Sequence, residues 1–106
     1  MRFLRIVVMM LIGATAASAA DWRDAAVAEI VKEKQVVEVM FSQPISLWAS
    51  MYDDGSRRDG YAEYLCLVLF SSGMPKGESV IITIWDATAM VQGDMKRIGR
   101  FECDRR

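Results

Sequence analysis

The sequence predicts a small α+β domain in which helix, strand, strand, helix, strand and strand follow one another. Two observations indicate this order: the spacing of apolar residues switches between the helical and the strand period, and Gly, Pro, Asp and Ser gather where it switches. Since helices and sheets each bury one apolar face, we expect a four-stranded, mainly antiparallel sheet with two helices packed on one face. One disulfide should close the fold.

The first nineteen residues have the layout of a secretory signal peptide. Arg2 and Arg5 precede an apolar run, and small residues at 17–19 provide a cleavage site. The uncharged run over residues 6–20 is shorter than the roughly 20 apolar residues that cross a bilayer. We therefore expect residues 1–19 to be cleaved, and residues 20–106 to be exported as a single domain to the periplasm or beyond, with no transmembrane segment.

Composition and charge disfavour several classes of function. Thirteen basic residues, less the two arginines of the predicted leader, oppose 14 acidic residues and leave a net charge of −3. An acidic chain is a poor partner for nucleic acid. The sequence contains no histidine, so the usual zinc sites and a serine–histidine nucleophile lack a member. We expect no enzymatic activity, no cofactor and no metal site.

The first predicted element is an amphipathic helix over residues 21–34, with Asp21 at its N-cap. Its charged residues lie away from one apolar stripe. The stripe consists of Trp22, Ala26, Val27, Ile30 and Val31.

Alternation with period two then predicts two strands over residues 35–41 and 45–52, joined through residues 42–44. One face of the second strand carries Trp48 and Tyr52 among serines. This face is a candidate binding surface, although an aromatic residue there is more often covered by a helix.

A charged stretch follows the second strand. Asp53, Asp54 and Gly55 are typical of a turn, because Asp bonds its own backbone and Gly accepts a positive φ. Residues 56–59 fit a capping box, in which Ser56 and Asp59 exchange hydrogen bonds with backbone amides. Arg57 and Arg58 stand inside the stretch and would repel a calcium ion, so we interpret it as a turn and a helix start.

The second helix should run from about residue 57 to residue 72 and stop at Gly73 and Pro75. Residues 64–70 could instead form a buried strand, but their leucine-rich composition favours a helix. The main face comprises Tyr61, Tyr64, Leu65, Val68 and Leu69. A second stripe comprises Leu67, Phe70 and Met74. We expect this stripe to pack on the first helix, or else to form a patch for a partner or a second copy.

The last part of the chain predicts two further strands. Residues 79–85 are rich in β-branched side chains, which is typical of a central strand. Residues 87–94 form one helical turn or a loop. In residues 95–103, Met95, Phe101 and Cys103 alternate with Lys96, Arg100 and Glu102.

The two cysteines, Cys66 and Cys103, should pair, because export places them in an oxidising compartment. The pair would pin the carboxyl end of the chain onto its middle. A redox or metal-binding pair would usually show a tighter spacing or a nearby histidine.

The sequence favours a non-enzymatic protein-interaction or accessory domain of the cell envelope. Its partner would be an envelope or secreted protein, or a second copy. The alternatives are an inhibitor of a secreted or envelope hydrolase, with residues 53–58 as an inserted plug, and a binder of small ligands or metal. The candidate binding surface comprises Trp48, Tyr52, Asp53, Asp54, Arg57, Arg58 and Phe70.

Overall fold

A computed structural model of the chain describes residues 21–106. The predicted signal peptide, residues 1–19, lies outside the described residues. The elements are α2 (Asp21–Ile30), β1 (Glu38–Gln43), β2 (Ser46–Met51), α3 (Asp59–Ser71), β3 (Ser79–Asp86), α4 (Ala87–Val91) and β4 (Arg97–Asp104). The predicted α+β order is confirmed, and the uncertain segment after β3 is the short helix α4.

The four strands form one mixed sheet in the order β1-β2-β3-β4. The β1–β2 and β3–β4 pairs are antiparallel, whereas β2 and β3 are parallel. The parallel pair arises because α3 carries the chain from the end of β2 back to the start of β3, as parallel neighbours require. Two of the three strand pairs therefore agree with the mainly antiparallel sheet that we predicted.

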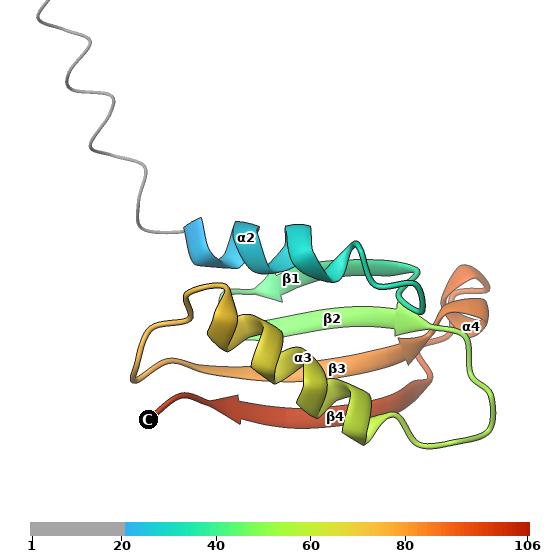
Figure 1. Cartoon of the computed structure of the whole chain (residues 1–106). Coiled ribbons are helices and arrows are strands. Elements are labelled where there is room, and N and C mark those ends of the chain that lie inside the picture. The colour runs from blue at the N-terminus through green and yellow to red at the C-terminus, as the bar shows by residue number, and fades with distance from the viewer. Residues whose placement is uncertain (1–20) are drawn as a thin grey trace, which may run out of the picture.

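Helices α2 and α3 lie side by side on one face of the sheet, while α4 lies at the end where β2 and β3 finish (Figure 1). The core fills the layer between the two long helices and the sheet. Its fully buried large side chains are Ile30, Leu47, Met51, Leu65, Leu69, Met74, Val80, Ile82, Ile84 and Cys103.

Helix α2 buries most of its predicted stripe. Trp22, Ala26 and Ile30 belong to the core, and the indole of Trp22 meets the ring of Phe41 edge to face at 5.9 Å. The assignment of Val31 to this stripe was wrong, since its side chain is 61% exposed. The helix ends at Ile30, four residues before the predicted end at residue 34, so Val31 lies beyond it.

The predicted turn before α3 is confirmed. The carboxylate of Asp53 accepts a hydrogen bond from the backbone N–H of Gly55 at 2.9 Å, and Gly55 has a φ of +92°. The carboxylate of Asp54 accepts from the backbone N–H of Ser56 at 3.0 Å. Both bonds are the local Asx turns that favour Asp in such segments.

The predicted capping box was wrong. Helix α3 begins at Asp59, after an N-cap Arg58 whose side chain makes no capping bond. The hydroxyl of Ser56 donates to Asp54 at 2.6 Å instead. The carboxylate of Asp59 accepts from the backbone N–H of Arg100 in β4 at 2.9 Å. The Ser56 hydroxyl therefore bonds within the turn, and the Asp59 carboxylate bonds to β4. Neither group caps α3.

Residues 64–70 are helical, as predicted, and α3 ends just before Gly73, whose φ is +106°. Its second apolar stripe does not pack on α2 as we expected. Leu67 is 60% exposed, and Phe70 lies under the guanidinium of Arg105, 5.3 Å from the ring centre. Only Met74 of this stripe is buried. It follows the turn at Gly73, and its backbone N–H donates to the carbonyl of Leu69 at 3.1 Å.

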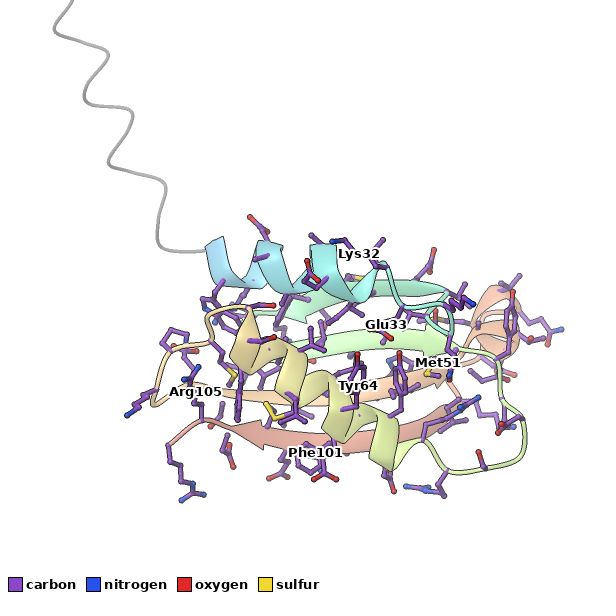
Figure 2. The ribbon with its side chains drawn as sticks, viewed as in Figure 1. Lys32, Glu33, Met51, Tyr64, Phe101 and Arg105 are labelled. Atoms are coloured by element: carbon purple, nitrogen blue, oxygen red, sulfur yellow. A yellow bond between two sulfur atoms is a disulfide. The ribbon has the colours of Figure 1, made fainter. Side chains whose placement is uncertain are left out.

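A contact through Glu33 joins the two long helices. The carboxylate of Glu33, just beyond α2, accepts hydrogen bonds from the hydroxyls of Tyr61 and Tyr64 at 3.2 and 2.7 Å. Figure 2 shows Glu33 and Tyr64 pointing toward one another between the helices. The loss of solvent raises the pKa of the Tyr61 hydroxyl, and the nearby carboxylate raises it further.

The predicted disulfide between Cys66 of α3 and Cys103 of β4 is confirmed, with a Cα–Cα distance of 5.4 Å. It ties the second helix to an edge strand of the sheet and is compatible with an extracellular location. Among the helices that the structure describes, none has the length and apolar character needed to cross a membrane.

Candidate functional site

The face of the sheet that points away from α2 and α3 is the candidate site. The strand register brings together on it Met40 of β1, Trp48 of β2 and Thr83 of β3. Side chains alternate along each strand, so this face carries the residues that the core does not use. Trp48 is therefore not covered by either long helix.

Two indole rings form the centre of this face. Trp48 and Trp85 meet edge to face, with ring centroids 5.3 Å apart and planes at 74°. Aromatic pairs favour this geometry because the positive edge of one ring meets the negative face of the other. Ser50 and Thr83, next to them on β2 and β3, are buried. The tryptophans therefore form a fixed, partly exposed platform.

An open groove of about 400 Å³ lies beside this platform, between β1, β2 and α4, and we call it the Trp48 groove. It is lined by Val31, Val37, Glu38, Val39, Met40, Trp48, Ala49, Ser50 and Met90. Glu38 is the one charged residue in this lining. Met40 is 52% exposed, and Val91 at the neighbouring end of α4 is 88% exposed.

A second hollow of about 390 Å³ adjoins the groove and is lined by Lys34, Gln35, Val37, Tyr52, Asp54 and Arg58. Val37 borders both. The Arg58 guanidinium donates to the backbone carbonyl of Tyr52 at 3.0 Å and lies 3.5 Å from the Asp54 carboxylate. Tyr52, Asp54 and Arg58 thus lie together, next to the groove that holds Trp48.

The remaining charges of the turn pair with neighbours. The Lys96 ammonium lies 2.7 Å from the Asp53 carboxylate, and its hydrogen bond holds the pKa of Asp53 below its usual range. The Arg57 guanidinium contacts Asp59 at 2.9 Å and lowers the pKa of that carboxyl in the same way. This turn therefore presents charge pairs that largely neutralise one another.

Phe70 is not part of the same site. It lies near the carboxyl-terminal end of α3, where it lines a separate hollow with Leu67, Phe101 and Arg106. Figure 2 shows Arg105 just beyond β4, near this end of α3, and Phe101 about midway along β4. The predicted surface is therefore divided into the face of Trp48, the adjoining hollow and turn, and the distant Phe70.

Of the residues that line the Trp48 groove, sequence reasoning identified Trp48 alone. The missed residues on which the site most depends are Glu38, Met40 and Met90. The period-two alternation already placed Glu38 and Met40 on one face of their strand, but only the hairpin register sets that face beside Trp48. Met90 carried no such signal, because its place depends on how α4 packs at the end of the sheet. In the part of the chain described, no group of three or more Cys, Asp and Glu side chains could hold a metal ion.

The fold and this surface define a small, disulfide-closed α+β domain with an aromatic platform on the side of its sheet that faces away from α2 and α3. No protein-family model matches the chain, and comparisons with the curated proteins and with the solved structures find no significant match.

Proposed function

We propose that this protein is an exported, non-enzymatic interaction module that binds an envelope or secreted protein through the face of its sheet that points away from α2 and α3. The observation that carries the proposal is the Trp48 groove, in which exposed apolar side chains adjoin a fixed pair of indole rings. Tryptophan and methionine are enriched at protein interfaces, where charged residues are depleted from the centre.

The exposed apolar residues around the groove come from separate elements. Val37 precedes β1, Met40 lies on β1, and Val91 ends α4. A single exposed apolar residue needs no explanation, but a contiguous patch on a small domain is the usual mark of an interaction site. The groove joins these elements into one surface that a partner could cover.

Export to the periplasm or beyond rests on the predicted signal peptide and is supported by the disulfide. Disulfides persist in oxidising compartments and are rare where thiols are kept reduced. The partner should therefore belong to the envelope or to the secreted proteins.

A small apolar ligand in the same groove is the second candidate, because a volume of about 400 Å³ lies in the range of small-molecule sites. The third reading, a hydrolase inhibitor with residues 53–58 as its plug, finds less support. The carboxylates and guanidiniums of that turn bind one another, Asp59 or Lys96 and leave little free charge for a target.

The test is affinity capture of partners from an extract of the organism's own envelope by the oxidised protein. Met40→Asp places a charge on the groove, and Leu67→Asp places the same charge on exposed α3, on the other side of the sheet. The wild type and the Leu67 variant should capture one stoichiometric partner that the Met40 variant loses. Capture that survives Met40→Asp but not Leu67→Asp would contradict the proposal.

The same variants decide between a protein and a small ligand. A ligand that binds only the native state raises the melting temperature. A melting-temperature increase with small apolar compounds, abolished by Met40→Asp and without any captured protein, would favour the second candidate.

A further inference from the structure

The two edges of the sheet differ in how they are protected. Edge strands expose unpaired backbone groups, which natural proteins guard with charged side chains or by covering the edge. Strand β4 carries both protections. Its charged residues are Arg97, Arg100, Glu102 and Asp104. The segment before α3 also covers it, since Arg58 donates its backbone N–H to the carbonyl of Ile98 at 2.8 Å.

Strand β1, at the opposite edge, is less protected. Helix α2 contacts Phe41 on its core face, and the one register irregularity of β1 lies at the hairpin end, between Phe41 and Gln43. Its six residues contain one charged side chain, Glu38, and no proline or lysine. Within residues 21–106, its backbone forms hydrogen bonds with its hairpin partner β2 and with no other element. An edge with so few charged residues, and with no covering segment among residues 21–106 paired to its backbone, is a template for one more strand.

The Trp48 groove runs along this same edge. Residues from both faces of β1 line it. Val37 and Met40 are exposed, and Trp48 lies on the neighbouring strand. A segment that paired with β1 would direct every second side chain toward the groove, because side chains alternate along a strand. One bound segment would therefore pair with the main chain of β1 and also place its side chains in the apolar groove.

The charge of the groove indicates which occupant fits. Glu38 is the only charged lining residue, and no ion pair of the described chain includes it. A second copy that paired through its own β1 would bring the sequence EVMFSQ, which has no basic residue. A lysine or arginine of a different protein would complement Glu38, and its charge could also lie over the indole of Trp48.

We propose that β1 and the Trp48 groove bind an extended segment of a partner protein as a fifth strand of the sheet. An apolar side chain of this segment lies over Met40 and Trp48, and a lysine or arginine faces Glu38. This inference rests on the proposed function and specifies the chemistry of the partner.

Phage-displayed random dodecapeptides, selected on the oxidised protein, test the charge preference. Three targets are used: the wild type, Glu38→Lys, and Glu63→Lys as the matched charge reversal on exposed α3. The wild type and Glu63→Lys should enrich peptides with apolar residues at alternate positions and a basic residue among them. Glu38→Lys should enrich acidic peptides, and should bind the wild-type peptides at least about tenfold more weakly.

N-methylation of the best peptide tests strand addition. Alternate backbone N–H groups of a strand point to opposite edges. Methylation of every second residue should therefore abolish binding in one frame and leave it nearly unchanged in the other. Equal effects of the two frames would overturn the fifth-strand assignment.

The possible outcomes of these experiments separate this inference from the proposed function. Peptides that need Met40 but ignore Glu38 would overturn the basic partner and leave the groove as the binding site. Failure to enrich any peptide would overturn the extended segment, while the envelope capture still decides the proposed function. A wild-type dimer that Met40→Asp converts to a monomer would give the edge to a second copy and overturn the inference.

Discussion

Gly99 in β4 lies directly against the backbone of Arg58, the residue that precedes α3. A Cβ atom added to Gly99 would lie 2.6 Å from both the carbonyl carbon and the carbonyl oxygen of Arg58. The Arg58 N–H donates to the carbonyl of Ile98 in the same place, so this is a main-chain joint between helix and strand. Backbone atoms held on both sides cannot swing aside as the end of a flexible side chain can.

Gly99→Ala should therefore lower the free energy of unfolding by about 2 kcal/mol, the scale of other overpacking substitutions. Gly60→Ala is the matched control, because a Cβ there meets nothing within 4 Å. In the first turn of α3 it should be neutral or stabilising by about 0.5 kcal/mol. Urea unfolding of both variants measures the difference, and equal stabilities would show that the joint can open at little cost.

Two leucines of α3, two positions apart, should differ sharply in their contribution to stability. Leu69 is fully buried beneath the helix, whereas Leu67 is largely exposed. Leu69→Ala should cost about 2–5 kcal/mol through lost burial and the cavity left behind. Leu67→Ala should stay within about 0.5 kcal/mol. Similar urea midpoints for the two variants would contradict this difference in burial between the two leucines.

The sequence was sufficient for the elements and their order because the period of the apolar pattern changes at each boundary. The alternation from Val37 to Phe41 indicated β1, and the positive φ that Gly73 accepts marked the end of α3. The pairing of Cys66 with Cys103 followed from their being the only two cysteines. These features depend on neighbours along the chain.

What the sequence could not show depends on contacts between distant segments. The capping box at residues 56–59 was a sound local pattern, but Arg100, 41 residues beyond Asp59, supplies the N–H that its carboxylate accepts. The stripe of Leu67 was assigned to α2 because the sequence does not show which side of α3 meets β4. Strand pairing decided both outcomes.

The candidate site likewise has features that neighbours in the sequence determine and features that contacts between distant segments determine. Period-two alternation identified the face of Trp48, but the depth of the groove comes from the register of the hairpin and from Met90 of α4. Phe70 entered the predicted surface as a surplus apolar residue of α3, although the structure places it at another hollow. Grouping residues by kind could not replace knowledge of the strand order.

The stability of the fold should fall at acid pH partly through Asp59. The Arg57 guanidinium and the N–H of Arg100 hold its pKa below the ordinary value of 3.8. A carboxyl with a lowered folded-state pKa stabilises the native state above the unfolded pKa, and this contribution is lost as the pH falls through the folded value. Asp59→Asn should be less stable than the wild type at pH 7 and equal to it near pH 2.

Urea unfolding across this pH range measures the effect. Arg57→Ala, which removes the first cause of the lowered pKa, should reduce the difference between neutral and acid pH without eliminating it. A deficit of Asp59→Asn that stays the same from pH 7 to pH 2 would assign the effect to packing and not to ionisation.

The disulfide should contribute a large share of the total stability. Cys66 and Cys103 are 37 residues apart, and a cross-link over a loop of this length stabilises the native state by about 4 kcal/mol in the chain-entropy model. Small domains have only about 5–15 kcal/mol in all. The double variant Cys66→Ala, Cys103→Ala should therefore be close to unfolding at physiological temperature.

Urea unfolding of the oxidised wild type, the reduced wild type and the double variant separates two causes of this loss. Reduction removes the cross-link and keeps both sulfur atoms, whereas the double variant also removes sulfur from the fully buried site of Cys103. The reduced protein should account for most of the deficit, and the double variant should add about 1 kcal/mol or more for the vacated core. A reduced protein as stable as the oxidised one would show that the contacts of α3 with β4 hold without the covalent bond.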